Sequence, residues 1–175
     1  MFFRNWLAVL AVLSCSLAFN GCYSLKGFSI DYNQTKSFSV KTFELQAPTA
    51  PPLLNINFSE QLRQRVRTNT RLQYIATASA DINFTGAITG YNVTTVAAQN
   101  ANTVVGATAQ LQQLEIIIQV NYENTKDEKK NWTETLRYQT TFPASQTLTS
   151  VQDQLFLEAS NNIIDQIFNK AFSNW

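Results

Sequence analysis

The feature that most constrains the fold is an alternation of apolar and polar residues over positions 114–122. A side-chain period of two indicates a β-strand with one buried face. The apolar members are Leu114, Ile116, Ile118, Val120 and Tyr122. Ile118 is predicted to be buried at the centre of this strand, and Ile117 to matter less for stability. The charged turn NTKDEKKN, residues 124–131, leads into a second alternating segment, residues 132–142, and the two segments are predicted to form a β-hairpin.

Upstream of this hairpin, the sequence predicts two further strands and a helix. SFSVKTFEL, residues 37–45, contains β-favouring Phe and Val and ends before a proline-rich stretch. The following helix is predicted to start at Asn57, with Glu60 completing a capping box, or at Ser59. Residues 81–91 form the next strand, in which Gly90 is expected to allow a bulge or tight bend. Residues 100–108 are small and polar and predict a loop.

The last predicted element is a long amphipathic helix. Thr149 and Gln152 offer a capping box at its start, and two adjoining apolar stripes continue toward Trp175. So wide an apolar face requires a partner surface, and the sheet is the surface available. The order of strand, helix, three strands and helix therefore predicts an α+β domain of two layers, with a mixed sheet of about four strands and both helices on one face.

The start of the chain has the pattern of a lipoprotein signal peptide. Arg4 precedes an apolar run of 14 residues, 6–19, which ends shortly before Gly21 and Cys22. The run suits a secretory leader and is shorter than the ~20 apolar residues of a spanning helix. Residues 1–21 are predicted to be removed, which leaves a single domain, residues 22–175, with a short tether and a lipid on Cys22. Cys15 is the alternative lipidation site, after a shorter apolar run.

The composition argues against most kinds of catalysis. The chain has no histidine, which excludes Ser-His-Asp and Cys-His sites and the usual zinc, copper and iron ligand sets. Cys15 is expected to leave with the leader and Cys22 to be lipidated, so neither a disulfide nor a thiol nucleophile is expected. Without Arg4, 12 of the 13 basic residues remain and balance the 12 acidic ones, so no net charge attracts nucleic acid. We expect no metal, no cofactor and no enzyme activity.

Several stretches together resemble a known family. CYSLKG at the predicted mature start, SFSVKTF, NTKDEKKNW and the final IFNKAFSNW occur in an order and at separations similar to those of the LptE lipopolysaccharide-assembly lipoproteins, in the form found in Bacteroidota-type bacteria. The resemblance covers nearly all of residues 22–175. It implies an outer-membrane lipoprotein that faces the periplasm, plugs the barrel of its partner LptD, and helps to deliver lipopolysaccharide to the outer leaflet. Such a protein binds lipopolysaccharide without turnover.

Candidate contact residues follow from the chemistry of these two partners. Lipid A carries phosphates, which arginine binds well. Arg63, Arg67 and Arg71 recur every four residues on the predicted first helix and are the candidate lipopolysaccharide-binding residues, although a solvated helix face gives the same pattern. A barrel lumen is polar, so the candidate partner-binding surface is the polar hairpin face, with the loops at residues 100–108 and 126–131. Its residues are Gln119, Asn121, Thr133, Thr135 and Arg137.

Two alternative interpretations stay open at this point. The chain is then either an envelope lipoprotein that binds another cell-surface component or a lipid-anchored hydrolase that uses carboxylates. Glu115 and Glu123 share a predicted strand face. A glycoside hydrolase needs a pair of carboxylates of this kind. Purification distinguishes these interpretations, because only an LptE-like protein is expected to be recovered with a large β-barrel.

Overall fold

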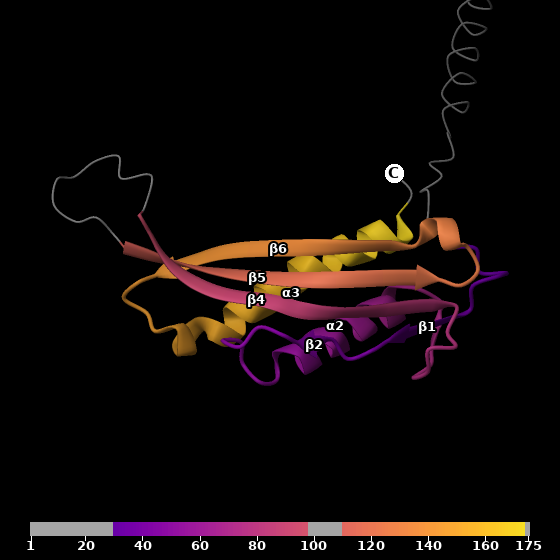
Figure 1. Ribbon diagram of the computed structural model, residues 1–175, viewed down its shortest axis with the longest axis horizontal. Helices are drawn as coiled ribbons and strands as arrows, with labels where there is room; N and C mark the ends of the chain where they lie inside the picture. Colours follow the sequence, from indigo (N-terminus) through magenta and orange to yellow (C-terminus); the bar gives the residue numbers. More distant parts are fainter. Residues whose placement is uncertain (1–29, 98–109, 174–175) are drawn as a thin grey trace, which may run out of the picture.

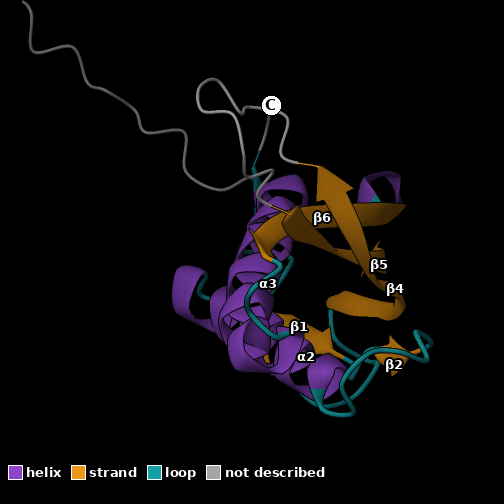
Figure 2. Ribbon diagram, turned by 90° about the vertical axis from the view of Figure 1, so that its left-hand side faces the viewer, coloured by secondary structure: helices purple, strands orange, loops and turns teal. Residues whose placement is uncertain are grey.

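A computed structural model describes residues 30–97 and 110–173, which form one mixed sheet with two helices on one of its faces (Figures 1 and 2). Cys15, Cys22 and the predicted loop at residues 100–108 lie outside the described residues. In chain order the elements are β1 (Ser37–Val40), β2 (Glu44–Leu45), α2 (Leu54–Asn69), β3 (Gln73–Tyr74), β4 (Ile82–Ala97), β5 (Gln110–Asn124), the short 3-10 helix η1 (Glu128–Lys130), β6 (Trp132–Pro143) and α3 (Leu148–Phe172). The α+β class is confirmed, but the described sheet has six strands rather than about four.

The sheet is built around the antiparallel strands β4, β5 and β6. Its order is β3-β1-β4-β5-β6, and the short strand β2 also pairs with β4. β1 and β2 run parallel to β4, whereas β5 is antiparallel to both of its neighbours. The predicted hairpin is therefore confirmed as β5 and β6, and Ile118 lies opposite both Ile88 and Leu136. The register shift between Ile88 and Gly90 confirms the predicted irregularity in β4.

The predicted strand over residues 37–45 is interrupted, because the backbone of Phe43 turns away from the sheet toward α2. The Phe43 N–H donates to Ser59 Oγ at 2.9 Å, and Asn55 Nδ2 donates to the Phe43 carbonyl at 2.8 Å. The Phe43 ring packs edge-on against Phe58, with ring centres 5.1 Å apart. Both backbone groups of Phe43 are thus satisfied by helix side chains instead of a strand, and the segment splits into β1 and β2.

The predicted helix starts are wrong at both helices. α2 begins at Leu54, three residues before Asn57, and no side chain caps it; Ser59 is buried inside the helix and its hydroxyl donates to the Asn55 carbonyl at 2.6 Å. The first turn is closed instead by the Leu54 N–H, which donates to the Pro51 carbonyl at 3.1 Å. α3 begins at Leu148 after Thr147, again without a side-chain cap, so the capping boxes proposed at Asn57 and Thr149 do not form.

The core lies between the helices and the sheet face that they cover. Ile118 is 1% exposed while Ile117 is partly exposed, which confirms the predicted face of β5. The largest fully buried side chains are Tyr122, Phe38, Phe43, Phe58, Phe84, Phe172, Leu62, Ile82, Ile88, Leu114, Ile116 and Ile118. Because the helices cover only one face, the polar side chains of β4, β5 and β6 are left on the other.

Candidate functional site

The open face of the sheet, which the helices leave uncovered, is lined by polar side chains. The predicted partner-binding residues Gln119, Asn121, Thr133, Thr135 and Arg137 are all exposed on it. They occupy the positions of β5 and β6 that alternate with buried ones such as Val120 and Leu136. The structure therefore brings these five residues together on one surface, as the period of two predicts.

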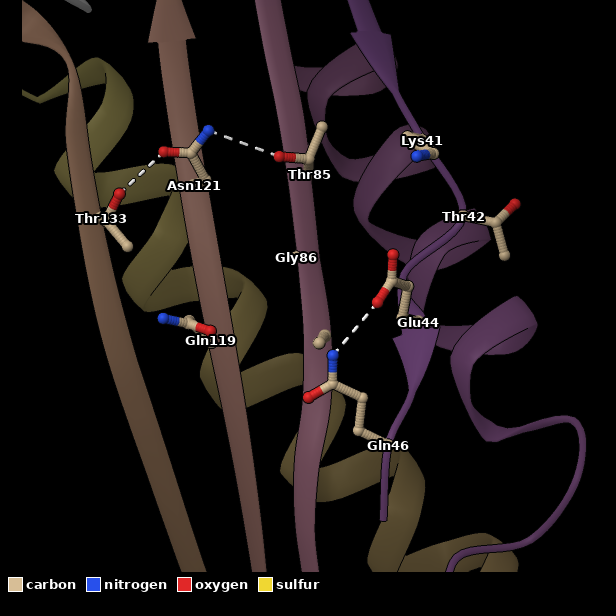
Figure 3. Close-up of a pocket in the computed structure, with 10 residues that line it drawn as sticks. Lys41, Thr42, Glu44, Gln46, Thr85, Gly86, Gln119, Asn121 and Thr133 are labelled. Carbon is tan, nitrogen blue, oxygen red and sulfur yellow. Dashed lines mark hydrogen bonds between the residues drawn. The ribbon is translucent and has the colours of Figure 1, made fainter. Parts of the chain in front are cut away.

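Hydrogen bonds between side chains cross this face from strand to strand (Figure 3). Thr133 Oγ1 donates to Asn121 Oδ1 at 2.7 Å, and Asn121 Nδ2 donates to Thr85 Oγ1 at 3.4 Å. The row links β6, β5 and β4 without charged groups. The hydrogen bonds between these side chains hold them in place on the face. The side chains still have donors and acceptors that can form further hydrogen bonds.

Glu115 gathers a second set of polar side chains on the same face. Gln139 Nε2 donates to Glu115 Oε1 at 2.7 Å, Arg137 Nη1 donates to the same oxygen at 3.0 Å, and Asn92 Nδ2 donates to Oε2 at 3.3 Å. The pKa of Glu115 is lowered, mainly by the hydrogen bond from Gln139. Asn92 and the charge and hydrogen bond of Arg137 lower it further, whereas burial acts in the opposite direction. Glu115 is therefore an ionised acceptor that holds Arg137 on the sheet.

The carboxylate pair of the hydrolase interpretation is not assembled in this structure. Glu115 and Glu123 lie eight residues apart on the single strand β5, which places them about 27 Å apart at the rise of an antiparallel strand. Glycoside hydrolases need their two carboxyl groups within roughly 5 to 10 Å of each other. In the described part of the chain, moreover, no cluster of three or more Cys, Asp or Glu residues can hold a metal ion.

A shallow hollow of about 420 Å³ opens on the same face beside the break between β1 and β2. Figure 3 shows Lys41, Thr42, Glu44 and Gln46 on one side of it and Gln119 on the other. Gln46 Nε2 donates to Glu44 Oε2 at 3.1 Å. The sequence pattern does not predict this half of the polar face, because an unbroken strand over residues 37–45 would leave no gap. The only local signal is the loss of strict alternation at Lys41 and Thr42.

The predicted arginine stripe is divided by the structure. Arg63 pairs with Glu60, its guanidinium lies 4.7 Å from the centre of the Tyr74 ring, and its side chain is 23% exposed. Its Nη2 also donates to the Val40 carbonyl at 3.4 Å. Arg63 therefore ties α2 to β1 and β3, and it is not presented to a ligand as the sequence pattern predicted.

The other two arginines of the stripe remain exposed. Arg67 lies in the last turn of α2, whereas Arg71 follows the end of the helix and lies 5.9 Å from the centre of the Tyr32 ring. Neither has an ion-pair partner among residues 30–97 and 110–173. Arg65, on a different side of α2, pairs with Asp165 of α3. The prediction that Arg71 continues a helical row is wrong, because α2 ends at Asn69.

The charged turn after β5 is neutralised by its surroundings. Lys126 Nζ lies 3.1 Å from Asp81 Oδ1, and Lys130 Nζ lies 3.7 Å from Asp127 Oδ2. Residues 124–131 carry three lysines and two acidic residues, and Asp81 supplies a further carboxylate from outside the turn. Within the described ranges, no helix has the length and apolar character needed to span a membrane.

These features define a class of protein: a two-layer α+β domain whose most distinctive surface is a broad polar sheet face. A family model described as LptE, Lipopolysaccharide-assembly, matches residues 35–171. The chain belongs to the LptE lipopolysaccharide-assembly family, and the resemblance noted from its sequence stretches is confirmed. A comparison with curated protein sequences found no match.

Solved structures of similar fold come from several bacteria. The hypothetical protein CT253 from Chlamydia trachomatis has a TM-score of 0.51 and 9% identity, over 80% of this chain and 99% of that one. A minor lipoprotein from Acinetobacter baumannii has a TM-score of 0.46 and 15% identity, over 77% of this chain and 91% of that one. At 9% identity, the similarity to CT253 shows a similar fold and nothing more.

Proposed function

We propose that this protein is a lipid-anchored plug of an LptD-type barrel in the outer membrane, where it faces the periplasm and binds lipopolysaccharide without turnover. The observation that most supports this function is the open sheet face, on which uncharged side chains bond from β6 to β4. The lumen of an outer-membrane barrel is polar. A polar, hydrogen-bonding face of this kind fits such a lumen better than an apolar patch would.

The proposed anchor is the lipid on Cys22. Ile30, the first described residue, follows Cys22 by eight positions, so eight fully extended residues span at most about 29 Å. A domain held this close to the membrane can meet a barrel in the same membrane by diffusion in two dimensions. Lipidation therefore serves the encounter with the barrel as well as retention.

Lipopolysaccharide contact is proposed for Arg67 and Arg71. Both guanidinium groups are exposed, and neither pairs with a carboxylate in the described part of the chain. Arginine binds phosphate through two parallel hydrogen bonds, which suits the phosphates of lipid A. Arg63 is left out of this proposal because its contacts with Glu60 and Tyr74 are structural.

The decisive experiment uses the full chain with a C-terminal tag, co-expressed with the LptD-type barrel of the same genome and extracted in detergent. We expect the barrel to be retained through affinity purification and gel filtration in a constant ratio to the tagged chain. A monomeric tagged chain that elutes without the barrel would overturn the plug function. Stable recovery with a different envelope component instead would favour the interpretation of an envelope lipoprotein with another partner.

A further inference from the structure

The two edges of the sheet are built very differently. One edge is the two-residue strand β3, whereas the other is β6, which runs for 12 residues from Trp132 to Pro143. The pairing of β5 with β6 continues without a register shift from Leu111 with Pro143 to Tyr122 with Trp132. Figure 1 shows β6 along the upper edge, with no described strand beyond it. Proteins usually shorten, bend or cover such an edge, since it is a template for another strand.

One hydrogen bond identifies which backbone groups of β6 face the open edge. Ala144 follows β6 and donates its N–H to the Gln110 carbonyl at 3.0 Å, in the register set by Pro143 opposite Leu111. In an antiparallel pair, successive residues direct their N–H and C=O alternately toward the partner strand and away from it. Even-numbered residues of β6 therefore bond to β5, and odd-numbered ones point outward. Pro143, which has no N–H, occupies an outward position, as this assignment requires.

The outward set coincides with the polar face of β6. It consists of Thr133, Thr135, Arg137, Gln139 and Thr141, whose side chains are all exposed. Each of these residues offers one N–H and one C=O to an incoming strand. A strand added at this edge would thus extend both the backbone ladder and the polar face of the sheet.

The helix α3 holds this edge in position from beneath. Lys170 Nζ donates to Glu134 Oε2 at 2.5 Å, and the Tyr138 hydroxyl donates to Glu158 Oε1 at 2.5 Å. Leu136, between these two contacts, is 7% exposed and belongs to the core. The edge is therefore already ordered as a strand, and pairing with it does not require β6 to fold first.

We propose that the open edge of β6 accepts an extended segment of the barrel partner as an additional β-strand. This inference rests on the proposed plug function, and it specifies how the barrel is recognised: through backbone hydrogen bonds, with small polar side chains continuing the open face. A second copy of this chain fits less well. Full antiparallel overlap of residues 133–141 with themselves would place Arg137 opposite Arg137, and like charges in that position are unfavourable.

The first test removes one outward N–H and leaves the rest of the ladder in place. Thr135→Pro deletes an outward donor and adds a ring at the edge, where proline is tolerated because β5 does not use that N–H. We expect recovery of the co-expressed LptD-type barrel to fall about tenfold. Thr135→Val keeps the N–H and serves as the matched control, with recovery within about twofold of wild type. Thermal melts of both variants establish that the domain remains folded.

The second test follows individual backbone amides of the wild-type chain by hydrogen exchange. The amides of Thr133, Thr135, Arg137, Gln139 and Thr141 should exchange rapidly in the isolated protein and slowly in the barrel complex. The even-numbered amides of β6 should be slow in both. Slow exchange of the outward amides in the isolated protein would overturn the inference, because it would mean that this chain or a second copy already covers the edge.

The two proposals fail in different ways. If wild-type protein does not retain the barrel, the plug function and the strand addition are both wrong. If wild-type protein retains the barrel and Thr135→Pro retains it equally well, strand addition alone is wrong. Outward amides that stay fast in the complex would likewise exclude strand addition while leaving the plug function intact.

Discussion

Ser37 and Asp81 bind each other reciprocally at the point where β1 and β4 begin. Ser37 Oγ donates to Asp81 Oδ2 at 2.9 Å and accepts from the Asp81 N–H at 3.0 Å. The N–H groups of Lys36 and Ser37 also donate to Asp81 Oδ2, at 2.9 and 3.0 Å. Lys126 completes the cluster with its ammonium 3.1 Å from Oδ1. One carboxylate thus joins the parallel pair β1 and β4 to the turn after β5.

The Asp81 cluster predicts a loss of stability in acid. Burial by itself raises the pKa of Asp81, but the hydrogen bonds from Lys36, Lys126 and Ser37 outweigh it and lower the pKa from 3.8 to about 2. Because the folded-state pKa is the lower one, the stabilisation is fully present above the ordinary pKa. It disappears as the pH falls from about 4 to about 2. The difference corresponds to about 2 kcal/mol of unfolding free energy.

Asp81→Asn tests this linkage. Denaturant unfolding at pH 7 should show the variant about 2 kcal/mol less stable than wild type, with the gap narrowing as the pH approaches 2. Glu123→Gln removes an exposed carboxylate of β5 and serves as the control, with a change within about 0.5 kcal/mol. A gap that stays constant from pH 7 to pH 2 would contradict the role of the Asp81 charge.

Ile118→Ala should destabilise the domain far more than Ile117→Ala. Ile118 is 1% exposed at the centre of the covered sheet face, so truncation leaves a cavity and costs about 2 to 5 kcal/mol. Ile117 is partly exposed on the open face, and its truncation should cost less. Denaturant melts of the two variants provide the measurement, and equal small losses would contradict the two-layer arrangement.

Gly86→Ala should be strongly destabilising. A methyl group at this position would overlap the backbone carbonyl of Gln119 and lie 2.5 Å from the Phe43 ring. Because the Gln119 carbonyl belongs to the neighbouring strand, relief requires movement of the ladder, with an expected cost of about 3 kcal/mol or more. Thr85→Ala on the adjacent residue, measured in the same thermal melts, should cost much less. Comparable losses in the two variants would show that the close approach at Gly86 is unimportant.

Cys22→Ala should release the protein from the membrane. Each buried methylene of an acyl chain contributes ~0.8 kcal/mol, so several chains make attachment effectively permanent. We expect the variant in the soluble fraction of a cell fractionation, without the lipid mass seen in wild type. Cys15→Ala should be anchored normally. The opposite result for the two cysteines would place the lipid at Cys15.

Arg137→Glu should weaken barrel capture. The substitution removes the ion pair with Glu115 and puts a second carboxylate beside it, in the middle of the proposed contact surface. A folded variant with reduced barrel recovery is the expected outcome of the co-purification assay. Unchanged recovery would exclude this part of the sheet face from the contact.

Arg67→Glu combined with Arg71→Glu should have the complementary effect. These exposed residues lie away from the open sheet face, so barrel recovery should stay near that of wild type while binding of purified lipopolysaccharide falls. Arg65→Glu reverses one charge on the helical side, where it disrupts the pair with Asp165, and is the control for the effect of charge reversal on lipopolysaccharide binding. Normal lipopolysaccharide binding by the double variant would mean that the two arginines are only solvent-exposed side chains at the end of α2.

Local patterns in the sequence determined the β5–β6 hairpin, its buried face and the polar set on the opposite side. A period of two assigns every second residue to one face once any member is buried, so Ile118 and Asn121 could be placed without tertiary information. The element order likewise predicted two layers, because the apolar stripe of α3 needs a sheet to cover it. The helix starts were not predictable in this way, since backbone turns replaced the side-chain caps.

Tertiary contacts alone decided the rest. β1 and β2 are separate because Asn55 and Ser59, 12 and 16 residues further along the chain, take both backbone groups of Phe43. Arg63 became structural because β3 places Tyr74 beneath it. The open edge of β6 follows from the strand order. Pairing between strands distant in sequence depends on which segments meet in space, and no local residue pattern encodes that choice.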